Sequence, residues 1–140
     1  MWPSRRGRIG GATALAGPRR PLTGQRGERL AERHLRRAGY RILARNYRCP
    51  AGEADLIALD RRASGAVVFV EVKTRSSDRF VDPESAVDAR KRRQLLKVAQ
   101  FYLAGHDPGD RPVRFDVVAV VGSAKGRPQV RHIVNAFTPA

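Results

Sequence analysis

Val67-Val68-Phe69-Val70-Glu71-Val72-Lys73 is the stretch from which both the fold and a candidate site follow. Its run of large apolar residues predicts a buried β-strand. Side chains two positions apart share one face of a strand, so Glu71 and Lys73 lie on one side and Val70 and Val72 on the other. Charged groups at the end of a buried strand are costly unless they are paired or bind a metal ion. The stretch therefore predicts a functional site at the end of this strand.

A second acid, Asp55, lies sixteen residues before Glu71 within Gly52-Glu53-Ala54-Asp55-Leu56-Ile57. We expect this segment to form the preceding antiparallel strand, where facing side chains lie about 5 Å apart. Asp55 and Glu71 are then candidate ligands for Mg²⁺ or Mn²⁺, since these hard cations prefer carboxylate oxygens. Lys73 is the candidate for stabilising negative charge on a phosphate. Together these residues predict metal-dependent hydrolysis of a phosphodiester bond.

Two further acids have two interpretations each. Glu28 lies in the first turn of the first predicted helix, where it could complete the metal site or bind a second ion. Alternatively, it is a surface acid that favours the helix N-terminus. We include Glu28 among the candidate catalytic and metal-binding residues. Glu53 shares the strand face of Asp55 if the strand is regular there, and is otherwise a solvated charge near a turn.

The protein has a large surplus of positive charge. Its 140 residues include 28 Lys and Arg against 13 Asp and Glu, a formal net charge of +15. Such a surplus predicts a polyanionic partner, most often nucleic acid. The preference for Arg over Lys can reflect genome composition, but genome composition does not explain the shortage of acids.

Four basic residues are candidate nucleic-acid contacts. Arg75 follows directly after the strand that carries Lys73, so it could bind a phosphate near the site. Arg90, Arg93 and Lys97 fall on one side of the second predicted helix. Their alternative role is that of a solvated helix face.

The cysteine content and the hydropathy of the sequence indicate the cellular compartment. Cys49 is the only cysteine, so it cannot form an internal disulfide, and a reducing compartment is the simpler inference. No apolar run approaches the length of a membrane span. The N-terminal stretch has too few large apolar residues for a convincing signal peptide, although secretion stays as an alternative. We therefore expect a cytoplasmic protein without a membrane partner.

The chain divides into two parts. Residues 1–23 are rich in Arg, Gly and Pro and contain no acid, which predicts a disordered basic arm. Residues 24–140 predict one α/β domain in the order α-β-β-β-α-β-β, a mixed β-sheet flanked by helices. The expected helices cover residues 24–38 and 85–104, and the expected strands cover residues 40–47, 53–59, 67–74, 115–121 and 130–134.

A set of sequence motifs, taken together, resembles a known protein family. The motifs are Gly24-x-x-Gly27-Glu28, Gly39-Tyr40, Asn46-Tyr47-Arg48, Gly52 to Ala58, Val68 to Arg75, Arg114-Phe115-Asp116-Val117-Val118 and Asn135-Ala136-Phe137. Together they resemble the YraN family of uncharacterised bacterial proteins, which are similar to Holliday-junction resolvases. The resemblance implies a restriction-endonuclease-like fold with the PD-(D/E)xK signature, a Mg²⁺-dependent nuclease site, and DNA as substrate.

Carried over by position, the resemblance matches Glu28 to the acid of the first helix in resolvase-like nucleases. It matches Asp55 to the aspartate of the signature, and Glu71 and Lys73 to its (D/E)xK pair. One departure is that Ala54 stands where the signature has proline. The chemistry does not require proline, so this departure weakens the motif match rather than the proposed chemistry.

Two hypotheses of different class follow. The first is a metal-dependent DNA endonuclease, which could act on branched or junction DNA in repair or recombination. The second is a non-catalytic nucleic-acid-binding module that keeps a nuclease fold. A third and weaker hypothesis is a basic ribosome-associated protein in which the acids are accidental. Junction cleavage usually needs a two-fold dimer, so a homodimer is a possible assembly, although the sequence carries no dimer signature.

Overall fold

The computed structural model describes residues 22–62, 64–75, 87–123 and 126–138. The predicted arm at residues 1–23 lies outside these ranges except for its last two residues, and residues 76–86 also lie outside them. The elements are α1 (Gly24–Arg37), β1 (Tyr40–Cys49), β2 (Gly52–Asp60), β3 (Val67–Arg75), α2 (Ala89–Gly105), β4 (Val113–Val121) and β5 (Gln129–Ile133). The predicted order α-β-β-β-α-β-β is therefore confirmed.

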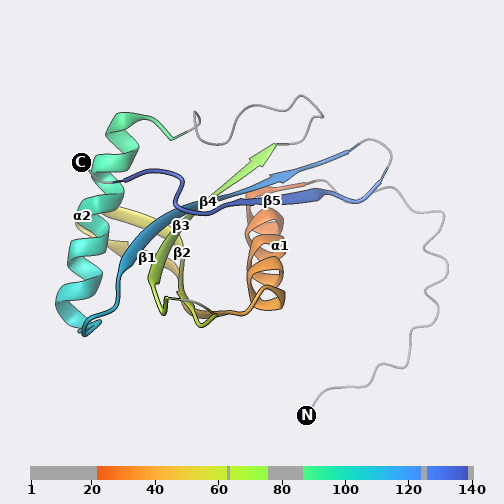
Figure 1. The fold of residues 1–140 in the computed structure, drawn as a ribbon. Coiled ribbons are helices and arrows are strands. Elements are labelled where there is room, and N and C mark those ends of the chain that lie inside the picture. Colours follow the sequence, from red (N-terminus) through yellow and green to blue (C-terminus); the bar gives the residue numbers. More distant parts are fainter. Residues whose placement is uncertain (1–21, 63, 76–86, 124–125, 139–140) are drawn as a thin grey trace, which may run out of the picture.

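The strands form one five-stranded mixed sheet in the order β1-β2-β3-β4-β5. β3 and β4 are parallel, and the other three neighbouring pairs are antiparallel. Parallel neighbours need a crossover, and α2 provides it. Figure 1 shows α2 and α1 on opposite sides of the sheet. The predicted α/β class, with helices flanking a mixed sheet, is thereby confirmed.

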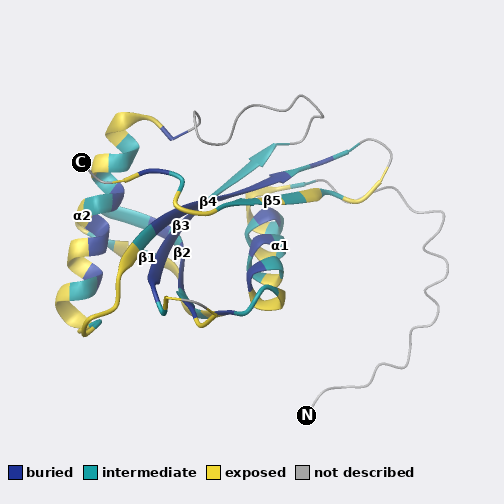
Figure 2. Cartoon of the chain, in the orientation of Figure 1, coloured by how far each residue is buried: buried dark blue, intermediate teal, exposed yellow. Residues whose placement is uncertain are grey.

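The alternation of side chains along β3 divides the core into two layers. Phe69 packs with Phe115 in the layer under α2, where Leu95 and Tyr102 also lie. Val68 and Val70 face the other way and pack in the layer under α1. β3 is buried on both faces for this reason (Figure 2), as its run of apolar residues predicts.

α1 packs closely against β3 at Gly27. Thr23 caps its N-terminus, since the Thr23 side chain accepts a hydrogen bond from Arg26 N at 3.0 Å. Gly27 is buried in the first turns and faces Thr74 of β3, and a Cβ atom at position 27 would overlap Thr74 Oγ1. The absence of a side chain at position 27 therefore sets the distance between α1 and β3, and it fixes where the adjacent Glu28 lies.

α2 begins at Ala89 because Asp88 caps it, accepting a hydrogen bond from Lys91 N at 2.9 Å. The prediction that this helix starts at residue 85 is therefore wrong, and residue 85 itself lies outside the described ranges. The buried face of α2 consists of Leu95, Val98, Ala99 and Tyr102. Within the described ranges, no helix is long and apolar enough to cross a membrane.

A buried polar network joins β2, β4 and β5 in the layer under α1. Arg114 donates to Asp116 Oδ1, Asp60 Oδ2 and the Tyr40 hydroxyl, at 2.9, 2.9 and 2.7 Å. His132 Nε2 lies 2.7 Å from Asp116 Oδ2. Asp116 is therefore paired with Arg114 of the same strand. Asp60 lies at the end of β2 and His132 lies within β5, and both join this network.

Candidate functional site

β2 and β3 bring Asp55 and Glu71 together. The two strands are antiparallel with Leu56 opposite Val70, and the two acids each lie one residue beyond that pair. Asp55 is fixed there because its Oδ2 accepts a hydrogen bond from Val72 N at 2.8 Å. The predicted pairing of acids from adjacent antiparallel strands is therefore present in the fold.

The environment of Asp55 favours its protonated form. Burial, followed by the negative charge of Glu71, raises the pKa of Asp55 to about 6. The hydrogen bond from Val72 N and the ammonium of Lys91 oppose this rise in pKa. When a buried carboxyl with a raised pKa lies beside a second acid, binding of a cation stabilises its ionised form.

Glu71 is almost completely buried, with 6% of its surface exposed. Lys73 Nζ lies 3.4 Å from Glu71 Oε2, and Lys91 Nζ lies 3.6 Å from Glu71 Oε1. Glu71 Oε1 is a buried oxygen without a hydrogen-bond partner in the part of the chain that the structure describes. A buried carboxylate oxygen left in this state is costly, so it has spare capacity to bind a cation.

Lys91 is the site residue that the sequence analysis did not identify. It comes from the first turn of α2, the element that follows β3 in the chain, and it reaches the same carboxylate as Lys73. The available signal was its spacing: Lys91 and Gln94 precede the buried Leu95 and Val98 at helical intervals. That spacing places them beside the buried stripe, but it does not predict which sheet residues they meet.

A hollow of about 500 Å³ lies over this end of β2. Its lining residues are Arg48, Cys49, Gly52, Glu53, Asp55, Lys91 and Gln94. Gly52 has a φ of 144°, and a Cβ atom there would overlap the Gln94 side chain. Asp55 therefore opens onto a polar hollow between β2 and α2 that can admit solvent and a substrate phosphate.

The two further acids lie at the edges of the site. Burial, followed by the charge of Asp55, raises the pKa of Glu28, whereas the nearby Asn46 amide lowers it. Glu53 Oε1 lies 3.5 Å from Arg48 Nε and lines the same hollow as Asp55. Among the described residues, no group of three or more His, Cys, Asp or Glu side chains is arranged to hold a metal ion. The acids that come together are thus the pair Asp55 and Glu71, and Glu28 is near enough to Asp55 for the two charges to interact.

The predicted nucleic-acid contacts lie apart from these acids. Arg90, Arg93 and Lys97 are all exposed on α2, whereas Lys91 of the same helix turns toward Glu71. Arg75 is half-buried, and its Nη1 donates to the backbone carbonyl of Thr74 at 3.2 Å. The three helix residues are therefore accessible to phosphates, although the structure does not gather them around Glu71.

The donor set fits a divalent metal ion. It combines carboxylates from adjacent strands, an unsatisfied buried oxygen on Glu71, and a pKa on Asp55 that neighbouring negative charge raises. Oxygen ligands of this kind suit Mg²⁺, which keeps several of its waters and needs only one or two carboxylates. The flanking ammonium groups of Lys73 and Lys91 are suited to an anionic substrate.

Comparison with known proteins places the chain in a family. Residues 27–120 match the family described as Uncharacterised protein family UPF0102. A UPF0102 protein of Pelobacter propionicus is 44% identical over 133 residues, which cover 94% of this chain and 93% of that protein. One from Symbiobacterium thermophilum is 48% identical over 114 residues, covering 81% of this chain and 94% of the relative. The chain belongs to the UPF0102 family, and the predicted resemblance to YraN proteins is confirmed.

Among solved structures, the chain is similar to one described as "Structure of EndoMS-dsDNA2 complex". The TM-score is 0.39 and the sequence identity is 19%. The match covers 78% of this chain and 41% of the other.

Proposed function

We propose that this protein is a metal-dependent endonuclease that hydrolyses phosphodiester bonds in DNA. The observation that carries the proposal is the buried Glu71 oxygen without a hydrogen-bond partner, placed beside Asp55 and between two lysines. A structural ion pair would be expected to satisfy its buried oxygens. A buried acid that keeps one oxygen without a hydrogen-bond partner and lies beside a second acid is typical of a site that binds a cation as part of its chemistry.

The candidate residues would have different roles in this reaction. Asp55 and Glu71 would hold Mg²⁺ or Mn²⁺, with Glu28 acting nearby through its charge or on a second ion. When bound, such an ion supplies an activated water and neutralises charge on the phosphate. Lys73 Nζ lies 3.4 Å from Glu71 Oε2, which supports a role in which its ammonium would stabilise negative charge that develops on the phosphate oxygens. Arg75, Arg90, Arg93 and Lys97 would contact phosphates further along the strand.

The proposal also covers the kind of DNA substrate, the assembly and the cellular compartment. The net charge of +15 supports a polyanionic substrate, and the resemblance to resolvase-like nucleases supports branched or junction DNA in repair or recombination. Cleavage of a junction would use a homodimer, because a junction presents two equivalent strands. A substrate of this kind would place the protein in the cytoplasm.

The deciding experiment is cleavage of a labelled substrate panel by purified protein with Mg²⁺ or Mn²⁺. The panel contains single-strand, duplex, flap and four-way junction DNA, together with RNA. We expect Asp55→Asn and Lys73→Ala to reduce the cleavage rate by roughly two orders of magnitude or more. Asp110→Asn is the matched control, because Asp110 is exposed in the loop before β4.

Each outcome has a defined meaning. Cleavage that requires metal and disappears in both variants, but not in the control, supports the nuclease. Cleavage that persists in both variants shows that the site is wrong or that a contaminant cuts. Tight binding to DNA without cleavage favours the second hypothesis, a non-catalytic nucleic-acid-binding module.

A further inference from the structure

A second, larger hollow lies between α1 and β1. It has a volume of about 560 Å³. Its lining residues, which define the α1–β1 groove, are Gln25, Glu28, Arg29, Glu32, Arg33, Arg36, Arg45, Asn46 and Leu56. Four arginines and two glutamates are among these residues, so the groove presents several cationic groups to an anion.

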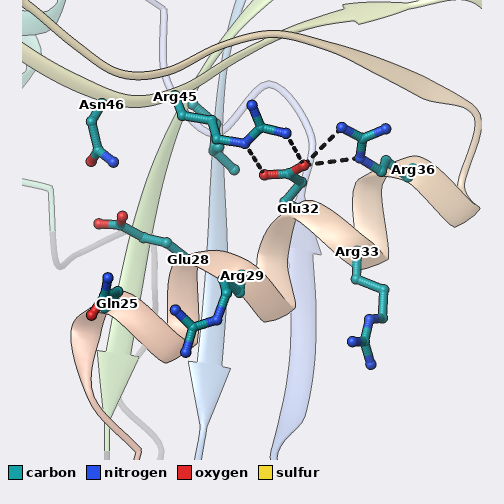
Figure 3. A pocket seen from close by; sticks show the side chains of 9 residues that line it. Gln25, Glu28, Arg29, Glu32, Arg33, Arg36, Arg45 and Asn46 are labelled. Atoms are coloured by element: carbon teal, nitrogen blue, oxygen red, sulfur yellow. Dashed lines mark hydrogen bonds and ion pairs between the residues drawn. The ribbon is translucent and has the colours of Figure 1, made fainter. Parts of the chain in front are cut away.

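Glu32 organises the upper part of this groove. Its carboxylate accepts hydrogen bonds from Arg45 Nε and Arg45 Nη2, both at 2.7 Å, and from Arg36 Nε at 2.9 Å. Figure 3 shows the two guanidinium groups meeting at this one carboxylate. The Glu32 side chain is 15% exposed, whereas the Arg36 and Arg45 side chains are 54% and 58% exposed.

Exposed ion pairs contribute little to the stability of a fold. The effect of this cluster is instead to hold the two arginine side chains in position. Each arginine has five N–H donors, and Glu32 uses only some of those on Arg36 and Arg45. The remaining donors are held in fixed positions at the surface. Fixed guanidinium groups lose less freedom when they bind an oxyanion, and they suit the geometry of a phosphate.

Arg29 and Arg33 extend the positive surface along α1. In Figure 3 their guanidinium groups point away from the Glu32 cluster, and neither takes part in an ion pair within the part of the chain that the structure describes. Positions 29, 33 and 36 follow one side of the helix over about 10 Å, given 1.5 Å per residue. A row of this length can contact more than one phosphate of a nucleic-acid strand.

The groove approaches the candidate catalytic site from the α1 side of the sheet. Glu28 belongs to its lining and lies within electrostatic reach of Asp55. Leu56, which follows Asp55 in β2, also lines the groove, so an anion bound there would lie beside the segment that carries Asp55. The exposed residues of α2 that the sequence analysis identified are not part of this lining.

We propose that the α1–β1 groove binds the sugar-phosphate backbone of a DNA strand and leads that strand to Asp55 and Glu71. Glu32 is a positioning residue that holds Arg36 and Arg45 for contact with phosphates. The binding role stands on the groove alone, while the direction of the strand toward the acids rests on the proposed nuclease function.

The test measures binding of fluorescein-labelled single-strand and duplex DNA by anisotropy over a range of salt concentrations in EDTA, so that no cleavage occurs. We expect Arg29→Ala combined with Arg33→Ala to weaken binding roughly tenfold near physiological salt, and to reduce the slope of log K against log salt by about 2. The matched control is Arg61→Ala combined with Arg111→Ala, which removes two exposed arginines outside the groove. Equal weakening by both pairs would overturn the proposal, because it would show only a general effect of charge.

Glu32→Gln separates positioning from charge. Removal of a negative charge alone would tighten DNA binding, whereas loss of the fixed arginines would weaken it. We expect weaker binding with a Tm close to that of the parent protein, and tighter binding would overturn the positioning role.

Failure of the groove and failure of the nuclease can be told apart. If Arg29→Ala with Arg33→Ala binds DNA like the parent protein while Asp55→Asn abolishes cleavage, the groove is wrong and the nuclease stands. If the double variant loses binding although the parent protein never cleaves, the groove stands and the nuclease is wrong. Retention of the parent protein by anionic lipid vesicles, with no binding to DNA, would assign the groove to a membrane surface and overturn the proposal.

Discussion

The carboxyl of Asp55 lies in a setting that favours cation binding at the expense of stability. Its pKa is raised to about 6 by burial and by Glu71, above the value of an unfolded aspartate, so the folded state binds this proton more tightly. Stability from this group is therefore highest when the pH is low enough to protonate Asp55, and it falls as pH rises from about 4 to about 6. Above that window the folded protein holds an unfavourable charge.

Asp55→Asn is thus expected to stabilise the protein without metal at pH 7.5, by on the order of 1–2 kcal/mol. Asparagine can still accept the hydrogen bond from Val72 N, so the backbone contact is kept. Urea denaturation in EDTA measures the difference, which should vanish near pH 4. A variant that is less stable than the parent at pH 7.5 would show that Asp55 is a structural acid.

Lys91 offers a test of how the site balances charge. Its ammonium lies 3.6 Å from Glu71 Oε1, where it partly neutralises the carboxylate that would bind a metal ion. We expect Lys91→Ala to tighten Mn²⁺ binding, measured by titration calorimetry, because a competing positive charge is removed. Cleavage should nevertheless slow, since a cation that can meet the substrate phosphate is lost. Lys97→Ala is the control for metal binding, and equal Mn²⁺ affinities in both variants would contradict the prediction.

Residue patterns predicted Asp55, Glu71 and Lys73 because the two-residue period of a strand fixes which side chains share a face. The same patterns did not predict Lys91 or the buried pairing of Asp60 with Arg114. Both depend on contacts between segments far apart in the chain, and a periodic pattern does not show which segments meet. The Glu32 cluster was missed for the same reason, since Arg45 joins it from β1.

At the scale of elements, one contact governs how α1 sits on the sheet. Gly27 faces Thr74, and any side chain at position 27 would overlap the threonine hydroxyl. The periodicity of apolar residues predicted the order and type of the elements. It predicted the residues at which the helices and strands begin and end less accurately. The start of α2 depended on capping by Asp88, which the charge-rich sequence around it conceals.

Gly27→Ala is expected to push α1 away from β3 and to destabilise the protein by roughly 2–3 kcal/mol. Because Glu28 follows directly, cleavage should fall as well. Combining it with Thr74→Ala should restore part of the lost stability, since the overlapping hydroxyl is then removed. Denaturation of the two single variants and the double variant measures this coupling, and strictly additive losses would contradict the proposed contact.

At the scale of the whole molecule, two groups of buried charge respond to pH in opposite ways. At the candidate site, ionisation of Asp55 destabilises the fold, because its pKa is raised to about 6. In the network under α1, burial would raise the pKa of Asp60, but hydrogen bonds from Arg114 and Arg62 outweigh it and lower the pKa to about 2. Burial likewise opposes a lowered pKa at Asp116, where contacts with His132 and Arg114 prevail. The network thus stabilises the fold above about pH 4 and loses this contribution as pH falls toward 2.

Asp116→Asn is therefore expected to destabilise the protein by about 3 kcal/mol at pH 7, because it leaves the buried Arg114 with less compensation. The loss relative to the parent protein should shrink below pH 4, as protonation removes the same charge from the parent. The effect of Asp55→Asn should instead grow above pH 4, so the two variants separate the fold-stabilising charges from those of the candidate site. Urea denaturation of both variants and the parent across this pH range measures the contrast. Parallel pH profiles for the two differences would show that the network and the site do not have the separate roles inferred for them.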